Sequence, residues 1–160
     1  MSKFTHIDEK GQVRMVNVTA KKTTSRTAKA QGHISMTAET FAAIMTQTAK
    51  KGNVLETARI AGIMAAKKTS ALIPMCHPLN ITHVQVDFFP DPADNAVRIE
   101  ATVRIVDQTG VEMEALTAVS IAALTIYDMC KSYDKQMTIS GISLLKKTGG
   151  KSGIFVRDQD

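Results

Sequence analysis

Apolar residues in the first third of the chain are arranged as in a strand followed by a helix. Residues 26–36 predict the strand. Thr37 has a residue type that caps helix N-termini, and residues 38–48 behind it predict the helix. Glu39 falls in the first turn of that helix, where a negative charge interacts favourably with the helix dipole. The polar KKGN at residues 50–53 is expected to break the helix.

A second helix is predicted directly after this break. Asn53 is followed three residues later by Glu56, which is a variant of the capping box that marks helix starts. The helix then runs to about Ser70, and Ala, Ile and Met occupy nearly every side of it. Because an all-round apolar helix is usually a buried one, we expect this helix to be buried.

Alternation with a period of two predicts two strands in the middle of the chain. Val84, Val86 and Phe88 alternate with polar residues, and the alternation resumes over residues 97–105 after a predicted loop at 89–95. Each strand should therefore have one buried face. The simplest arrangement of the two is an antiparallel hairpin.

The last third predicts a long helix and a final strand. Thr109 and Glu112 have the spacing of a further capping box, ahead of a helix over residues 111–132. Residues 136–147 predict the strand, followed by a Gly- and Lys-rich tail. At about 100° per residue, one stripe of the helix is continuously apolar: Leu116, Val119, Ala123, Ile126 and Cys130.

The order strand, helices, strand, strand, helix, strand matches the split βαβ arrangement of ferredoxin-like α+β domains, written βαββαβ. We expect an antiparallel sheet covered by helices on one face, in a single domain over residues 26–160. Residues 1–25 are polar and basic, and a mobile arm is predicted there. The other face of the sheet carries Thr, Val and Ile as well as charges, so oligomerisation is expected.

Composition narrows the class of partner. The 160 residues fit one domain, and the net charge of +5 favours an anionic partner. Five Phe, two Tyr and no Trp leave little for stacking on bases, and no RNP, KH or zinc-finger spacing is present, so nucleic acid is not the expected partner.

The cell compartment is predicted from cysteines and from apolar segments. Cys76 and Cys130 lack CxxC spacing, and the first residues show no apolar signal-peptide core, which predicts a cytoplasmic protein. The longest uncharged helical stretch, residues 115–127, is shorter than the ~20 residues that a membrane span needs, so no membrane association is expected.

The stretch IPMCHPL places a thiol and an imidazole between two prolines, and a metal site, a catalytic site or a rigid bend could explain it. Zinc needs three or four converging ligands, whereas Cys76 and His77 would point apart in an extended segment. As a bend, Pro74 and Pro78 stiffen the chain while Cys76 packs and His77 bonds to nearby backbone. Three other histidines show no ligand spacing among themselves: His6, His33 and His83.

A glycine-rich GGKSG at residues 149–153 invites comparison with a phosphate loop. The GxxxxGK motif would need glycine at position 145, which is Leu145, and no helical pattern follows. Lys146, Lys147 and Lys151 on this segment could still reach an anion. Solvated lysines are the alternative.

Several polar residues of the long helix share one sector of about 100°, with Ile121 and Leu124 between them. Charges that flank apolar side chains suggest a face buried against a partner. Asp128 and Lys131 within this sector form either a mutually tuned acid–base pair or an exposed ion pair. The polar members of the sector are Glu114, Thr117, Asp128 and Lys131.

Three blocks, IPMCHPL, GVEMEALTAVSIAALTIYDMCK and LLKKTGGKSG, resemble the MoaC family of cyclic pyranopterin monophosphate synthases, and the likeness extends over essentially the whole chain. The resemblance implies a ferredoxin-like subunit in a homo-hexamer built as a trimer of dimers. It also implies a reaction in molybdenum cofactor biosynthesis. That reaction converts (8S)-3′,8-cyclo-7,8-dihydroguanosine 5′-triphosphate to cyclic pyranopterin monophosphate and pyrophosphate.

Site residues are carried over from the family onto matching positions of this sequence. The resemblance implies catalytic roles for Asp128, Lys51 and Lys131. Asn17 stands where the family usually has aspartate. The positions that match substrate-binding ones are Met75, Cys76, His77, Glu112, Met113, Glu114, Lys147, Lys21 and Arg26.

Several proton transfers and the charge of a phosphate closure call for lysines and carboxylates of shifted pKa rather than a redox cofactor. No cofactor is expected; Mg²⁺ could accompany the triphosphate. A non-catalytic oligomeric nucleotide- or RNA-binding module is the alternative function. Glu114 and Asp128 are separated by about 21 Å of helix, so the simplest site containing both pairs Glu114 of one chain with Asp128 of another.

Overall fold

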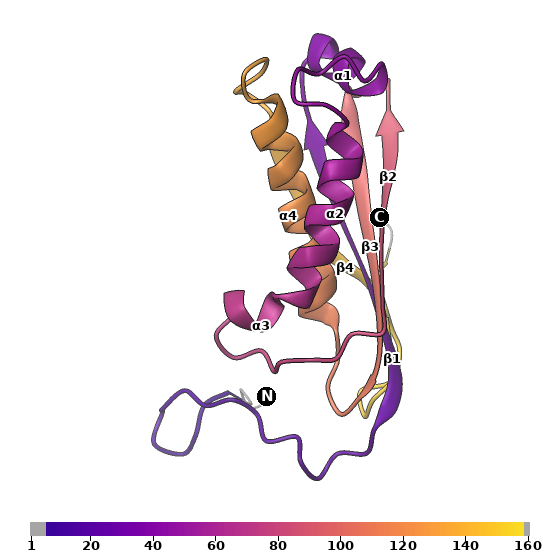
Figure 1. Ribbon diagram of the computed structural model, residues 1–160. Helices are drawn as coiled ribbons and strands as arrows, with labels where there is room; N and C mark the ends of the chain where they lie inside the picture. The colour runs from indigo at the N-terminus through magenta and orange to yellow at the C-terminus, as the bar shows by residue number, and fades with distance from the viewer. Residues whose placement is uncertain (1–5, 159–160) are drawn as a thin grey trace.

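The computed structural model describes residues 6–158 of the chain, and over these residues strands and helices follow the order β1, α1, α2, α3, β2, β3, α4, β4, β5 (Figure 1). Their bounds are β1 Thr24–Ser35, α1 Ala38–Met45, α2 Val54–Lys67, α3 Thr69–Leu72, β2 His83–Asp91, β3 Ala96–Asp107, α4 Glu112–Cys130, β4 Thr138–Thr148 and β5 Phe155–Val156.

The strands form one sheet with the order β2-β3-β1-β4-β5, in which every neighbouring pair is antiparallel. The β2–β3 hairpin and the central position of β1 confirm the predicted ferredoxin-like α+β arrangement. The short β5 was not predicted, because two residues, Phe155–Val156, are too few to show an alternating pattern. It pairs with Lys146 and Lys147 of β4.

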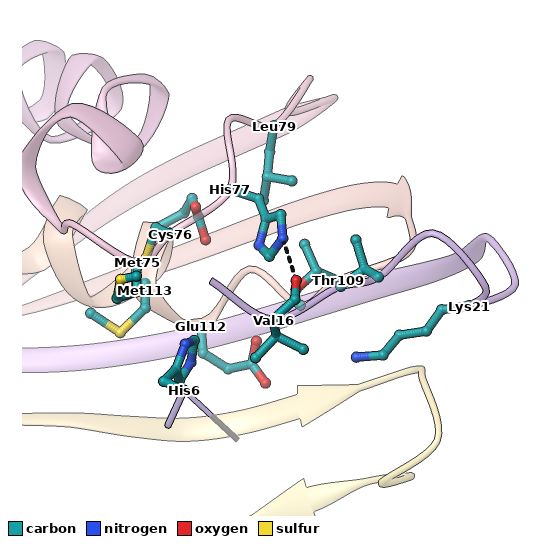
Figure 2. Close-up of a pocket in the computed structure, with 13 residues that line it drawn as sticks. His6, Val16, Lys21, Met75, Cys76, His77, Leu79, Thr109, Glu112 and Met113 are labelled. Atoms are coloured by element: carbon teal, nitrogen blue, oxygen red, sulfur yellow. Dashed lines mark hydrogen bonds between the residues drawn. The ribbon is translucent and has the colours of Figure 1, made fainter. Parts of the chain in front are cut away.

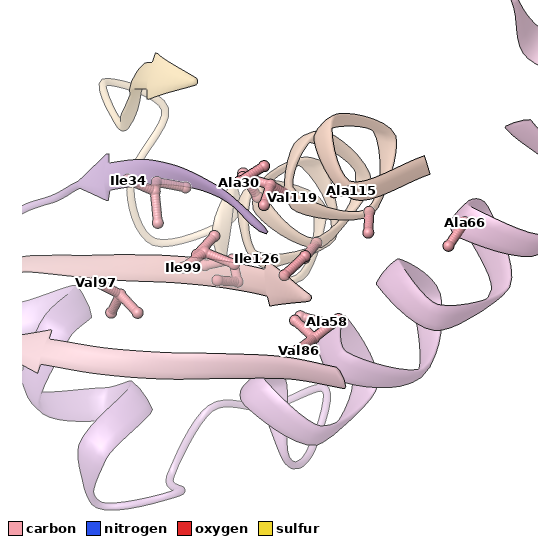
Figure 3. Packing of buried hydrophobic residues seen from close by; sticks show 14 of the residues in the cluster. Ala30, Ile34, Ala58, Ala66, Val86, Val97, Ile99, Ala115, Val119 and Ile126 are labelled. Carbon is pink, nitrogen blue, oxygen red and sulfur yellow. The ribbon is translucent and has the colours of Figure 1, made fainter. Parts of the chain in front are cut away.

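Helices α2 and α4 lie side by side on one face of the sheet, and within residues 6–158 the other face carries no helix (Figure 1). The core lies between these two layers (Figure 3). Small residues let the helices approach closely: a Cβ added to Gly62 of α2 would be 3.0 Å from the Ala118 backbone oxygen of α4. Branched residues of the strands fill the remaining space, including Ile34, Val86, Val97, Ile99 and Val103.

Two predicted helix caps are present. The Thr37 hydroxyl accepts a hydrogen bond from the Thr40 N–H at the start of α1. The Asn53 side chain accepts from the Glu56 N–H at 3.1 Å at the start of α2. In both cases the side-chain oxygen satisfies a backbone donor that the first helical turn leaves free.

The capping box predicted from Thr109 to Glu112 was wrong. Val111 precedes the first residue of α4 without any side-chain cap. The Glu112 carboxylate instead folds back over Gly110, where an added Cβ would be 2.8 Å from its Cδ, and lies 3.4 Å from Lys147. The Glu112 carboxylate thus pairs with Lys147 in space that Gly110 leaves free, and it does not cap the helix.

Two other boundaries differ from the prediction. Helix α1 ends at Met45, before the predicted end at residue 48, because Gln47 adopts a left-handed backbone conformation with φ 55°. Strand β2 extends into the predicted loop at 89–95 and ends at Asp91. Pro90 is tolerated there because β2 is an edge strand.

Within this chain helix α2 is buried on one side, so the expectation that the helix is buried is met for that side alone. Ala58 and Ala66 face the core, whereas Ile60 and Met64 are 59% and 50% exposed within this chain. The helix also ends at Lys67, earlier than predicted, and a separate turn of helix, α3, follows it. The sheet and α4 cover the inner side of α2 and leave its outer side uncovered.

Among the described residues, α4 alone is long and apolar enough to cross a membrane by length and composition. Half of its most apolar window is buried inside the fold, as in the core helix of a folded domain. Residues 6–23 lie outside the sheet and pass beneath α3 in Figure 1. The mobility predicted for the arm over residues 1–25 stays a prediction, and its first five residues lie outside those described.

Candidate functional site

The candidate residues gather at the two ends of α4. Glu112, Met113 and Glu114 are at its first turn, whereas Asp128 is in its last turn, with Lys131 just beyond it. A rise of about 1.5 Å per residue separates the Glu114 and Asp128 backbones by about 21 Å. Within one chain the structure therefore forms two clusters, which we call the pocket cluster and the lysine cluster.

The pocket cluster surrounds a cavity of about 340 Å³ (Figure 2). Three segments that are distant in the sequence form its walls: the arm, the proline-flanked bend and the start of α4. The lining residues are His6, Val16, Val18 and Lys21 from the arm, Met75, Cys76, His77 and Leu79 from the bend, and Thr109, Gly110, Glu112, Met113 and Glu114 before and in α4.

His77 ties the bend to the arm. Its Nε2 lies 2.9 Å from the Val16 backbone oxygen, as the dashed line in Figure 2 shows. A carbonyl oxygen can only accept, so Nε2 carries the proton and donates it. The backbone contact predicted for a rigid bend is therefore present, and the same imidazole lines the cavity. In the described chain, the bend is thus part of a pocket wall.

Glu114 is the buried carboxyl of the pocket cluster, with an exposed fraction of 3%. Its pKa is raised from 4.5 to about 7, chiefly by burial and also by the charge of Glu112, against a backbone hydrogen bond that lowers it. A carboxyl that titrates near neutral pH can both give and take a proton.

Cys76 is affected in the same direction. Burial, followed by the charge of Glu114, raises the pKa of its thiol. The thiolate is the reactive form of cysteine, and these surroundings disfavour it. Cys76 is accordingly suited to packing against a ligand and poorly suited to nucleophilic attack.

A lysine of strand β4 pairs with a carboxylate of the pocket cluster. Lys147 Nζ, on β4, lies 3.4 Å from Glu112 Oε1, and it also donates a hydrogen bond to the Ser152 hydroxyl. Both members of the ion pair are largely shielded, with side chains 22% and 30% exposed. The cluster therefore contains a salt bridge beside Glu114, whose pKa is raised to about 7.

The lysine cluster consists of Asp128 between two lysines. Lys131 Nζ is 2.6 Å from Asp128 Oδ1, and Lys51 Nζ is 3.5 Å from Oδ2. Lys51 also donates to the Asp128 backbone oxygen at 2.9 Å, so the loop after α1 is attached to the end of α4. Of the two alternatives for Asp128 and Lys131, the exposed ion pair is present within this chain, because their side chains are 60% and 53% exposed.

Ion pairing shifts the pKa values of Asp128 and Lys131. The hydrogen bond and the charge of Lys131, followed by the charge of Lys51, lower the pKa of Asp128. The hydrogen bond to Asp128 raises the pKa of Lys131. Asp128 is therefore held as an anion and Lys131 as a cation.

The sequence predicted most of the pocket's bend and helix residues but missed several others. Thr109 and Gly110 lie in the loop just before α4, and their closeness in sequence to Glu112 could have indicated that they line the same pocket. The arm carried no periodic pattern that could have indicated His6, Val16 or Val18. Of the predicted substrate-binding residues, Arg26 and Lys147 do not line the cavity. Arg26 lies in β1 and bonds to backbone oxygens of residues 107 and 108, and Lys147 lies in β4 and pairs with Glu112 of the lining.

A bound metal needs three or more converging side-chain ligands. Within residues 6–158, no three His, Cys, Asp or Glu side chains converge as metal ligands. Glu112 and Asp128 each have lysine partners, and Glu114 is buried.

Similarities to known proteins extend over almost the whole chain. The family model described as the MoaC family matches residues 15–150. A cyclic pyranopterin monophosphate synthase of Desulforapulum autotrophicum is 65% identical over 159 residues, which are 99% of this chain and 98% of the relative. Relatives of the same name from Desulfatibacillum aliphaticivorans and Roseiflexus sp. (strain RS-1) are 65% and 59% identical, over 99% of this chain and 99% and 100% of their own.

Proposed function

The chain belongs to the MoaC family, and we propose that it is a cyclic pyranopterin monophosphate synthase, a lyase of molybdenum cofactor biosynthesis. Its substrate is (8S)-3′,8-cyclo-7,8-dihydroguanosine 5′-triphosphate, and its products are cyclic pyranopterin monophosphate and pyrophosphate. The observation that carries this proposal is the near-complete coverage of relatives with this name at up to 65% identity.

The chemistry of the two clusters supports the reaction. Rearrangement of a purine-derived ring needs proton transfers, for which Glu114 has a pKa near neutrality. Closure of the cyclic phosphate concentrates negative charge, which Lys51 and Lys131 can stabilise. Asp128 fixes both lysine side chains through its two carboxylate oxygens.

A site that uses both clusters would have to join two subunits, and we propose a homo-hexamer, a trimer of dimers, with the substrate at a subunit interface. The pocket cluster of one chain would face the lysine cluster of another. Apolar side chains on the outer helix surface support this arrangement, because Ile60, Met64 and Leu124 are 59%, 50% and 52% exposed in the isolated chain.

Product analysis tests the activity. Purified protein incubated with the cyclised dihydro-GTP should release pyrophosphate together with a compound that oxidises to a fluorescent pterin. The matched control is Asp128→Asn, which keeps the size of the side chain and removes its charge. Stoichiometric binding of the nucleotide without turnover would favour the non-catalytic nucleotide- or RNA-binding module instead.

Mixing inactive variants tests the shared site. Asp128→Asn and Glu114→Gln chains, each inactive alone, should regain part of the activity when their subunits exchange, because some interfaces then combine two intact clusters. Asp128→Asn mixed with an Asp128→Asn/Glu114→Gln chain is the control and should regain none. Confirmed exchange without recovered activity would show that each site is built from one chain.

Two further parts of the proposal concern metal and compartment. We propose that the enzyme has no resident cofactor and that Mg²⁺ comes with the triphosphate, since lysines hold the carboxylates of Glu112 and Asp128. Turnover after chelation and dialysis should then depend on Mg²⁺ only through the substrate. A cytoplasmic location agrees with two free cysteines, Cys76 and Cys130.

A further inference from the structure

Two features singled out in the sequence, Arg26 and the glycine-rich GGKSG, lie next to each other but do not line the cavity. Arg26 Nε donates to the Asp107 backbone oxygen at 3.0 Å, and its Nη2 donates to the Gln108 backbone oxygen at 2.8 Å. These carbonyls directly precede Thr109 and Gly110, which do line the cavity. The guanidinium therefore holds the segment through which β3 leads into α4.

The glycine pair packs onto this guanidinium. Gly149 and Gly150 have left-handed backbones, with φ 89° and 76°. A Cβ added to Gly150 would lie 3.0 Å from Arg26 Cζ and would overlap Nη1, and one added to Gly149 would overlap the Ser25 backbone oxygen. Only glycine combines that backbone conformation with so close an approach.

The same turn is also connected to the pocket through Lys147. Ser152 accepts a hydrogen bond from Lys147, and Lys147 is paired with Glu112 in the first turn of α4. Residues 149–153 thus contact both Arg26 and Lys147. Arg26 supports the 107–114 segment through hydrogen bonds to backbone oxygens, and Lys147 supports it through the Glu112 carboxylate.

We propose that Arg26 and the Gly149–Gly150 turn form a brace that positions the Thr109–Glu114 wall of the pocket. Arg26 is then a positioning residue that acts through the 107–108 backbone, rather than a direct ligand of the triphosphate. A displacement of about 1 Å at a catalytic wall can lower the rate by about 10²-fold, so the brace matters to the proposed activity. The activity readout rests on the proposed function, whereas the brace itself does not.

Hydrogen exchange measures the brace without any substrate. Gly150→Ala should speed exchange of the amides in residues 108–114 at least tenfold, because its methyl group displaces the guanidinium. Gly153→Ala is the matched control: Gly153 also has a left-handed backbone, φ 67°, but nothing lies within 4 Å of an added Cβ. Equal exchange in the two variants would overturn the brace.

Arg26→Lys separates bracing from charge. Lysine keeps the positive charge but cannot reproduce the two divergent N–H groups that reach two carbonyls. We expect Arg26→Lys to lose kcat/KM nearly as severely as Arg26→Ala, about 10- to 100-fold, with faster exchange at 108–114. Near-normal activity and exchange in Arg26→Lys would instead assign Arg26 to charge-based phosphate binding.

Double variants test whether the glycine acts through the arginine. In an Arg26→Ala background, Gly150→Ala should change exchange and activity no more than Gly153→Ala does. A full additional loss would mean that Gly150 acts independently, and the brace would be wrong. If Gly150→Ala does not fold, Arg26→Lys still decides the question by exchange. If the wild-type chain shows no turnover, the proposed function fails, while the exchange data still test the brace.

Discussion

At the first turn of α4, Glu114 is almost completely buried and has its pKa raised to about 7, whereas in the last turn of the same helix the Asp128 side chain is 60% exposed and has its pKa lowered. The difference has a simple origin. The bend, the arm and the loop before α4 enclose the first end, while two lysines pair with the carboxylate at the other.

The comparison shows that one helix can hold two carboxyls in different protonation states at the same pH. Burial without a cation favours the neutral acid, and exposure beside cations favours the anion. Glu114 is therefore suited to proton transfer, and Asp128 is suited to holding lysines and charge. If the two ends meet across a subunit interface, one site contains a group of each kind.

The largest effects are expected in the lysine cluster. Asp128→Asn, Lys51→Ala and Lys131→Ala should each lower turnover by about 10²–10⁴-fold, the contribution typical of groups that transfer protons or stabilise developing charge. Their melting temperatures should change little, because exposed ion pairs contribute little to stability. Steady-state rates and thermal melts measure the two effects separately.

A second exposed ion pair serves as the control for these variants. Glu56 and Arg59 are also three residues apart on a helix, 3.1 Å from each other, and belong to neither cluster. Glu56→Gln should therefore leave turnover unchanged. Near-wild-type turnover in all three lysine-cluster variants would show that this end of α4 is not catalytic.

The next largest effect is on the stability of the folded protein, through Glu114 in the pocket cluster. Because the pKa of Glu114 is raised from 4.5 to about 7, the folded state retains a proton that the unfolded state releases. The favourable contribution is complete below pH about 4.5 and is lost as pH rises through about 7, with a total change on the order of 3 kcal/mol. Denaturant unfolding from pH 4.5 to 8 should show this decline.

Glu114→Gln removes the titrating group at nearly constant volume. Its free energy of unfolding should decline less over that pH range than that of the wild type. Glu39→Gln, an exposed first-turn position on α1, is the matched control and should follow the wild-type curve. Parallel curves for wild type and Glu114→Gln would mean that Glu114 is already ionised when buried.

A smaller effect is expected where the pocket meets the arm. His77→Ala removes the hydrogen bond to Val16, which is worth about 1 kcal/mol, so substrate affinity should fall about five- to tenfold. Hydrogen exchange in residues 13–18 should increase at the same time. His83→Ala, at the exposed edge strand β2, should change neither quantity. Unchanged exchange in His77→Ala would show that the arm does not depend on this bond.

The smallest effect is expected at Cys76. Cys76→Ser should keep activity within about twofold, because burial and Glu114 hold the thiol in its uncharged form and a hydroxyl has nearly the same size. Steady-state kinetics at several pH values would measure this. A loss comparable with that of Asp128→Asn would point to a chemical role for the thiol.

The sequence alone determined the features that depend on neighbouring residues. Thr37 and Asn53 cap helices because their side chains reach amides three residues away, and the alternation at Val84–Phe88 predicts a strand because side chains on a strand alternate between its faces. The distance between Glu114 and Asp128 also followed from the rise of one helix. These properties are local, so the chain's own spacing specifies them.

Only the tertiary structure decided which candidates are buried, paired or shielded. His77 meets Val16 from 61 residues away, Lys51 meets Asp128 from 77, and Arg26 meets Asp107 from 81. Glu112 was mistaken for part of a cap because its partner, Lys147, lies on strand β4, which is distant in the sequence. Burial and ion pairing depend on which distant segments pack together, and the periodicity of a single segment contains no information about its neighbours in space.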